Sequence, residues 1–324
     1  MRISISTVFF ILVLLLSGCG GGGGGTSSSS TTTTPTVFAS GNSMAYLRHL
    51  AFDGTNYLYV VDSNTLSTST SPISYGHLRQ FSATTSGSTA ITFENTTADL
   101  KNIFSVIKFN NDLLVSGETT NGSQGVIKIT LSSGTYTYTP KISVINLSLY
   151  GLAADTVNSR LFVVNQSAKT ILIHDSGYSA ISASPISGGW TEPTGLAYNG
   201  NYGGVGYIYV TDYRGGSSGL YKINTSSFAV SVISSSLFNY PNGVAVNTST
   251  GDVYVVNTGS GDTDSSILKI TAAGLVTTFL AGSVTSNMLC KPIGAAISGS
   301  YLYVTNGICT TNSAYASSVI KINL

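Results

Sequence analysis

Histidine and serine are the first residue types to consider for chemistry in this 324-residue sequence. Histidine is a common metal ligand and general base, and serine is a nucleophile where a base activates it. Its three histidines, His49, His77 and His174, lie far apart, and none has a second histidine at metal-ligand spacing. The sequence predicts no nucleophile elbow, which is a Gly-x-Ser-x-Gly turn between a strand and a helix, and no serine is linked by spacing to a histidine and an aspartate. The sequence therefore assigns no catalytic residue and identifies no metal ligand.

Cys19 stands at the end of an export signal. Arg2 gives a positive start, and residues 8–16 form an apolar run that is too short for a membrane-spanning helix, which needs roughly 20 residues. The following Leu16-Ser17-Gly18-Cys19 resembles the lipobox of bacterial lipoproteins. The resemblance implies that residues 1–18 are a signal peptide and that Cys19 becomes the lipidated N-terminus. An ordinary signal peptide with a chance cysteine is the alternative.

Residues 19–35 comprise this cysteine and a run of glycine, serine and threonine that ends at Pro35. Such a composition has nothing to bury and predicts a flexible tether. We therefore expect a lipid-anchored protein of the bacterial cell envelope, attached to the membrane through Cys19. Gly20 in place of aspartate favours the outer membrane or the cell surface, by analogy with lipoprotein sorting.

Residues 36–324 contain six copies of a short pattern rich in aliphatic and aromatic residues. The copies are Tyr57-Leu-Tyr-Val-Val-Asp62, Asp112-Leu-Leu-Val-Ser-Gly117, Arg160-Leu-Phe-Val-Val-Asn165, Tyr207-Ile-Tyr-Val-Thr-Asp212, Asp252-Val-Tyr-Val-Val-Asn257 and Tyr301-Leu-Tyr-Val-Thr-Asn306. Each is too short for a helix and reads as a buried strand. With one strand before and two after each copy, the arithmetic predicts an all-β, six-bladed β-propeller of four-stranded antiparallel blades.

The segments that flank these strands resemble those of a known repeat family. Pro-x-Gly-x-Ala-like segments precede the strands at Pro193, Pro241 and Pro292, and Ile-x-Lys-like segments follow them. This pattern resembles the NHL-repeat β-propellers, most clearly in the last three units. The resemblance implies an architecture and leaves the chemistry open, because the fold carries both enzymes and binding modules.

Two structural expectations follow from the repeat register. Only 18 residues follow Asn306, which leaves no room for a fourth strand in the last blade, so we expect residues 36–40 to pair with the C-terminal strand and close the ring. Cys290 and Cys309 fall on the same face of that blade in an exported protein, which predicts a disulfide between them. Two unpaired thiols are the alternative.

The face reached at the ends of the second strands is where we expect a ligand. The candidate residues at strand ends are Asp62, Asn165, Asp212, Asn257 and Asn306. Those at the entries to the innermost strands are Arg48, His49, Asn102, Tyr150, Glu192, Asn242 and Lys291, and a nearby loop carries Trp190. The strand-end residues either cap turns or form a ring of oxygen atoms suited to Ca²⁺ or a sugar. Trp190 is either an exposed platform or a packed ring.

Composition limits the function. Only 8% of residues are charged, and 14 basic residues face 13 acidic ones, so no field exists to attract nucleic acid. We expect a monomeric, non-catalytic module that binds a protein or a glycan at the cell envelope and needs no cofactor. The alternative is a metal-assisted, Ca²⁺-dependent lactonase or lyase acting at the mouth of the propeller channel.

Overall fold

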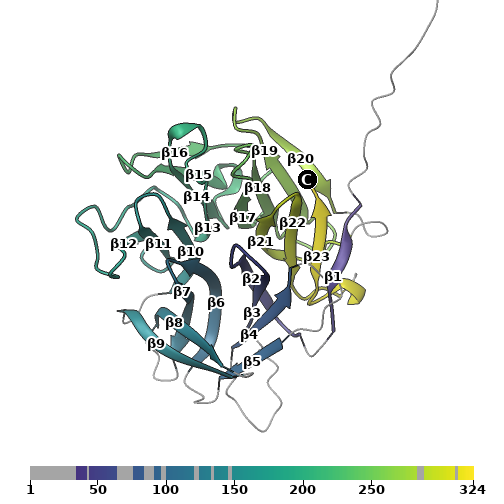
Figure 1. Cartoon of the computed structure of the whole chain (residues 1–324). Helices are drawn as coiled ribbons and strands as arrows, with labels where there is room; N and C mark the ends of the chain where they lie inside the picture. Colours follow the sequence, from purple (N-terminus) through teal and green to yellow (C-terminus); the bar gives the residue numbers. More distant parts are fainter. Residues whose placement is uncertain are drawn as a thin grey trace, which may run out of the picture. The chain divides into compact units, whose positions relative to one another are not determined.

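Six β-sheet blades surround a central channel in the computed structural model (Figure 1). The structure describes residues 34–41, 44–63, 76–83, 91–95, 100–119, 124–132, 135–144, 148–282, 288–310 and 313–324. The predicted signal peptide and most of the predicted tether lie outside these residues. No helix in this described part of the chain is long and apolar enough to cross a membrane.

The first three blades follow one another from the N-terminal side. The first contains β2 (Leu47–Phe52), β3 (Tyr57–Asp62), β4 (His77–Ser82) and β5 (Ile91–Asn95). The second contains β6 (Leu100–Phe109), β7 (Asp112–Thr119), β8 (Gln124–Ser132) and β9 (Thr135–Val144), and the third contains β10 (Leu149–Asp155), β11 (Arg160–Asn165) and β12 (Thr170–His174). A short parallel pairing between β5 and β9 joins the first two blades into one sheet.

The last three blades follow the NHL-like pattern. The fourth contains β13 (Pro193–Tyr198), β14 (Tyr207–Asp212), β15 (Leu220–Asn224) and β16 (Val230–Ile233), and the fifth contains β17 (Pro241–Val246), β18 (Val253–Asn257), β19 (Ser266–Ile270) and β20 (Val276–Ala281). The sixth contains β21 (Pro292–Ser298), β22 (Tyr301–Asn306), β23 (Val319–Asn323) and β1 (Thr36–Ala39). Short 3₁₀ helices lie at Tyr202–Gly204, Gly216–Ser218 and Ser313–Tyr315.

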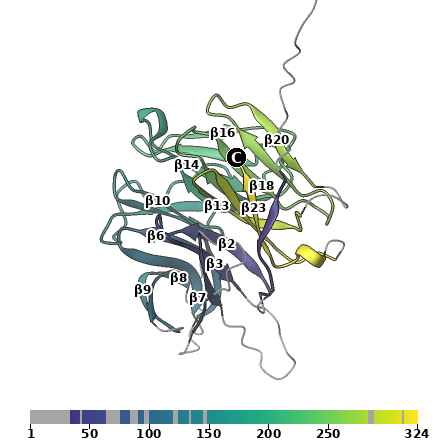
Figure 2. The same cartoon turned by 45° about the vertical axis from the view of Figure 1, so that its right-hand side comes forward.

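The predicted ring closure is confirmed. Strand β1 lies antiparallel to β23, with Thr36 opposite Lys321 and Val37 opposite Ile320. Both views place the purple β1 on the outer edge of the yellow C-terminal blade (Figures 1 and 2). The N-terminal strand therefore supplies the outer strand that the C-terminal residues are too few to form.

The third blade departs from the predicted four strands. Its outer segment makes only isolated bridges, between Ile171 and Ile186 and between His174 and Ala180. Between these bridges the hydroxyl of Ser184 accepts a hydrogen bond from the Ile173 backbone N–H at 3.0 Å, and Pro185 has no N–H to donate. The outer segment therefore follows the blade without forming a regular strand.

Adjacent blades are joined by a side-chain hydrogen bond at each of the six junctions. In each case a side chain at the end of a second strand donates to a backbone carbonyl on the innermost strand of the next blade. The bonds are Ser63 to Ile103, Ser116 to Tyr150, Gln166 to Pro193, Thr211 to Asn242, Thr258 to Pro292 and Thr305 to Arg48, at 2.5 to 3.5 Å. These bonds fix the spacing of the innermost strands, on which the channel depends.

Candidate ligand-binding site

Every innermost strand has a β-bulge near its entry, where its pairing with the second strand shifts register. A bulge leaves residues unpaired and re-aims their side chains. One unpaired residue from each blade lines the same cavity, of about 490 Å³, at one end of the channel. We call these six the bulge residues: Arg48, Phe104, Tyr150, Thr194, Asn242 and Ile293. Each blade thus contributes one side chain to the same cavity. We call this cavity the mouth cavity.

His49 occupies a position at which the other blades carry glycine or serine. At Gly195, for example, an added Cβ would lie 2.3 Å from the backbone oxygen of Asn242. His49 instead lines both the mouth cavity and a smaller channel space of about 170 Å³ beyond it. Burial, and then repulsion by Arg48, lower the pKa of His49 to about 4, although a hydrogen bond with the Asn242 side chain opposes the shift. Its imidazole is therefore neutral at pH 7.

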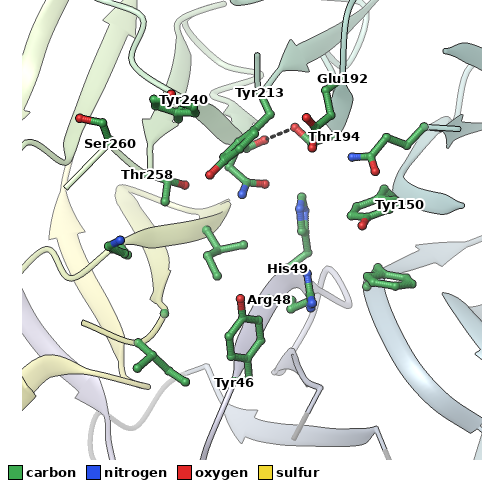
Figure 3. A pocket seen from close by; sticks show the side chains of 18 residues that line it. Tyr46, Arg48, His49, Tyr150, Glu192, Thr194, Tyr213, Tyr240, Thr258 and Ser260 are labelled. Atoms are coloured by element: carbon green, nitrogen blue, oxygen red, sulfur yellow. Dashed lines mark hydrogen bonds between the residues drawn. The ribbon is translucent and has the colours of Figure 1, made fainter. Parts of the chain in front are cut away.

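Two further sets of equivalent positions complete the wall. Residues just before the innermost strands or their bulges contribute Tyr46, Glu192, Tyr240 and Lys291, and residues just after the second strands contribute Gln166, Tyr213, Thr258 and Gly307. Figure 3 shows the rings of Tyr46, Tyr150, Tyr213 and Tyr240 around Arg48 and His49. The mouth cavity therefore combines aromatic faces with amide, hydroxyl and cationic groups.

The aromatic rings contact one another in pairs. Phe104 stacks on Tyr150 with ring centroids 4.5 Å apart, and Tyr213 meets Tyr240 at 5.2 Å. The guanidinium of Arg48 lies 4.8 Å from the centroid of Tyr46 and 5.0 Å from that of Phe104. Such contacts restrict the rings and the cation, so the cavity presents pre-arranged surfaces to a ligand.

Six of the thirteen residues that sequence analysis selected for the ligand face line the mouth cavity. They are Arg48, His49, Tyr150, Glu192, Asn242 and Lys291. The five strand-end residues do not line it, because their side chains are buried against the backbone: Asp62, Asn165, Asp212, Asn257 and Asn306. Asp212, for example, accepts the N–H of Glu192 at 2.6 Å, and Asn306 accepts that of Cys290 at 3.0 Å.

This capping arrangement does not fit the Ca²⁺ ring raised by the sequence. The carboxylate of Asp62 accepts the N–H of Tyr46 at 2.9 Å and pairs with Arg79 at 2.6 Å, so its oxygens are already engaged. Among the described residues, no three His, Cys, Asp or Glu side chains come close enough to hold a metal ion. The one carboxylate that lines the mouth cavity in this part of the chain, Glu192, pairs with Arg214 at 2.6 Å.

Trp190 and Asn102 also lie away from the mouth cavity. Trp190 is 3% exposed, its indole N–H donates to the backbone oxygen of Lys169, and its ring meets Tyr221 edge to face. It is therefore a packed ring between strands and not an exposed platform. Asn102 donates to the carboxylate of Glu118 at 2.8 Å.

Sequence analysis missed Tyr46, Phe104, Tyr213 and Tyr240, which supply most of the aromatic wall. A signal for them was present. Tyr46, Phe104 and Tyr240 occupy positions equivalent to ones that were selected in other blades, as Phe104 is equivalent to Arg48 and Tyr150. Tyr213 directly follows the selected Asp212 at the end of β14. In the second blade the absence of Pro-x-Gly obscured this register and led to Asn102, two residues too early.

The predicted disulfide is present in the structure. Cys290 and Cys309 are bonded, with their Cα atoms 5.6 Å apart. Their chain neighbours Lys291 and Ile308 both line the mouth cavity. The disulfide therefore ties together two segments of the cavity rim in the blade where the ring closes.

Comparison with known proteins agrees with this architecture. Residues 238–261, which include β17 and β18, match the NHL repeat family. No curated protein sequence matches the chain significantly. The structure is similar to that of a luciferin-regenerating enzyme, with 14% identity, coverage of 90% of this chain and 95% of that one, and a TM-score of 0.64.

Two further solved structures are similar at low sequence identity. A streptogramin B lyase has 13% identity and a TM-score of 0.58, with coverage of 90% of this chain and 98% of that one. A chain from a nidogen–laminin complex has 13% identity and a TM-score of 0.55, with coverage of 81% and 84%. At such identities the likeness concerns the fold alone. With its NHL match, its six blades and these structural neighbours, the chain is an NHL-repeat-like six-bladed β-propeller.

Proposed function

We propose that this protein is an exported, lipid-anchored binding module that holds a glycan in the mouth cavity without transforming it. The observation that carries the proposal is the composition of the cavity wall. Five aromatic rings, from Tyr46, Phe104, Tyr150, Tyr213 and Tyr240, surround a space of about 490 Å³ that amide and hydroxyl groups also line. A pyranose ring offers apolar C–H faces to aromatic rings and hydroxyls to amides, so it matches this wall.

A catalytic alternative lacks support of the same kind. A metal-assisted lactonase or lyase would need carboxylates that converge at the channel mouth. The strand-end aspartates Asp62 and Asp212 instead accept hydrogen bonds from backbone N–H groups. His49, the histidine nearest the cavity, has no carboxylate or nucleophile as a hydrogen-bonding partner among the described residues. No specific observation favours this second function.

Binding and the absence of turnover are tested together. Full-length protein in detergent is titrated with polysaccharide extracted from the producing bacterium's envelope, and the polysaccharide is then recovered for mass spectrometry. We expect saturable binding, an unchanged polysaccharide, and at least a tenfold loss of affinity in the double variant Tyr150→Ala, Tyr213→Ala, since each ring contributes about 1 kcal/mol. Tyr57→Ala is the matched control, because Tyr57 is 39% exposed at the opposite end of its blade. A shortened polysaccharide, or equal binding by the double variant, contradicts the proposal.

Anchoring is part of the same proposal and rests on residues outside the described part of the chain. Several acyl chains at Cys19 would hold the protein firmly on a membrane, whereas one gives only marginal binding. We expect mature protein to begin at Cys19 and to sediment with membranes. Fractionation of cells that express Cys19→Ser should yield soluble or unprocessed protein, and unchanged membrane retention would refute the anchor.

A further inference from the structure

Of the carboxylates that the structure describes, none pairs with Arg48 to balance its positive charge. Its Nε donates to the hydroxyl of Ser63 at 3.0 Å, and its guanidinium packs against the rings of Tyr46 and Phe104. Among the described residues, neither terminal nitrogen has a hydrogen-bond partner and no acid lies within ion-pair distance. Because Arg48 lines the mouth cavity, these two nitrogens are the donors it offers to a ligand.

Other cations around the mouth are neutralised within the protein. Lys291 lies 3.4 Å from the carboxylate of Asp262, and Arg214 lies 2.6 Å from that of Glu192. Burial lowers the pKa of Arg48, which shows that its surroundings disfavour the charge that it carries. His49 beside it is neutral at pH 7 and adds no second charge. In the described part of the chain, Arg48 is therefore the one uncompensated positive charge that lines this aromatic-walled cavity.

A second space adjoins the mouth cavity. A neighbouring space of about 360 Å³ is lined by Arg214, Phe238 and Asn239 together with Tyr213 and Tyr240, which line the mouth cavity as well. The Tyr213–Tyr240 pair thus forms a shared wall between two spaces. A linear ligand seated at Arg48 can extend past this pair toward Arg214.

We propose that Arg48 binds the carboxylate of an acidic sugar, and that the ligand is an acidic oligosaccharide extending from the mouth cavity into the neighbouring space. This inference rests on the proposed glycan-binding function and names the class of glycan. The two free Arg48 nitrogens form a planar pair that matches the two oxygens of a carboxylate. The rings of Tyr150, Tyr213 and Tyr240 line the mouth cavity and supply surfaces for sugar rings, which a short acidic peptide would use less fully.

Calorimetric titration of the full-length protein in detergent tests the inference with three probes. Trigalacturonic acid carries the carboxylates, its methyl ester keeps the rings without the charge, and a triglutamate peptide carries the charge without the sugar rings. We expect the acid to bind about 10- to 100-fold more tightly than the ester and the peptide, the range that charge-assisted hydrogen bonds provide. Arg48→Gln should abolish the preference for the acid over the ester, and Arg48→Lys should retain part of it.

Arg160→Gln is the matched control. Arg160 also packs against an aromatic ring, that of Phe228 at 5.2 Å, but it begins β11 at the end opposite Asn165 and does not line the mouth cavity. Equal affinity for acid and ester, or an unchanged preference in Arg48→Gln, overturns the inference while glycan binding itself stands. Tighter binding of the peptide than of either saccharide, or no binding of the acid, also overturns it. The proposed function fails separately, if envelope polysaccharide does not bind.

Discussion

The imidazole of His49 lies where the repeat otherwise places glycine or serine, and its burial there favours the neutral form. Its pKa of about 4 lies well below the ordinary value of 6.5 because the ring is buried beside Arg48. Between these two values the unfolded chain takes up a proton that the folded protein does not. The free energy of unfolding must therefore decrease as the pH falls from about 6.5 to about 4.

We predict that His49→Asn removes this dependence. The contribution of His49 is at most about 3.5 kcal/mol over the whole interval, since each pKa unit corresponds to about 1.4 kcal/mol. Urea unfolding of the wild type and the variant from about pH 7.5 to about pH 4.5 measures it. Because burial also lowers the pKa of His174, only the difference between the two profiles isolates His49. Parallel profiles would show that His49 titrates normally in the folded protein.

Of the 18 residues that line the mouth cavity, six could be selected from the sequence. Arg48, Tyr150 and Asn242 could be selected because the repeat places the entry to the innermost strand in their three blades. The role of Asp62 could not be separated from ligand binding, because an aspartate after a strand suits both a cap and a ligand. What decides between them is burial, and Asp62 is fully buried with Arg79 as its partner.

At the scale of the strands, the repeated lysine of the third strands joins the third strand to the second strand of the same blade. The ammonium group of Lys222 lies 4.4 Å from the ring centroid of Tyr207, and that of Lys321 lies 3.7 Å from the centroid of Tyr301. In other blades an aspartate replaces the ring, and Lys269 pairs with Asp252 at 2.8 Å. The lysine of each Ile-x-Lys segment is thus matched to a residue at the beginning of the neighbouring second strand or directly before it.

The hydroxyl bonds between blades give a prediction for the innermost strands. Thr305 donates to the backbone oxygen of Arg48 across the junction between the sixth and first blades. Thr305→Val keeps the shape of the side chain but leaves that oxygen without its partner, and we expect a loss of about 1–2 kcal/mol in the free energy of unfolding. Thr278→Val, at an exposed position on β20, should change it by less than about 0.5 kcal/mol. Chemical denaturation of both variants makes the comparison, and equal effects would exclude a role for the bond.

The disulfide should affect both the free energy of unfolding and ligand binding in the mouth cavity. Replacing Cys290 and Cys309 by serine opens a loop between residues 19 apart, and the chain-entropy model expects a loss of about 3 kcal/mol. The variant should also bind polysaccharide more weakly, because Lys291 and Ile308 on the rim lose their shared tether. Thermal unfolding and titration, each with and without reductant for the wild type, check both effects. A variant as stable as the oxidised wild type would refute the structural role.

Prediction of the elements succeeded where hydrophobic pattern determines the strand and failed where it does not. The second strands are almost continuously buried, as in the Val253–Asn257 strand β18, and their apolar runs are unmistakable. The outer segment of the third blade is set instead by Pro185 and by the hydrogen bond that the Ser184 hydroxyl accepts from the Ile173 backbone N–H. Neither feature has a periodicity that a sequence pattern can reveal.

At the scale of the whole molecule, two properties matter: the low content of charged residues and the closure of the ring of blades. With 8% charged residues and a net charge of +1, the protein has no strong overall field, so a single charge such as Arg48 dominates its surroundings. A ring also needs one closing contact that brings the chain ends together. The shortage of residues after Asn306 made this closure predictable, and β1 provides it.

Phe38 on β1 is the side chain that couples the closing strand to the rest of the sixth blade and to the first blade. It is 1% exposed, and its ring meets Tyr303 of the sixth blade at 5.1 Å and Phe81 of the first blade at 6.1 Å. Phe38→Ala should lower the free energy of unfolding by about 3–5 kcal/mol, the cost of emptying such a site. Val37→Ala on the same strand, at a position that is 37% exposed, should cost less than about 0.5 kcal/mol. Urea unfolding with hydrogen exchange of the first and sixth blades measures both variants. If the two variants unfold alike, Phe38 does not lock the ring, and its closure depends on the backbone pairing of β1 with β23 alone.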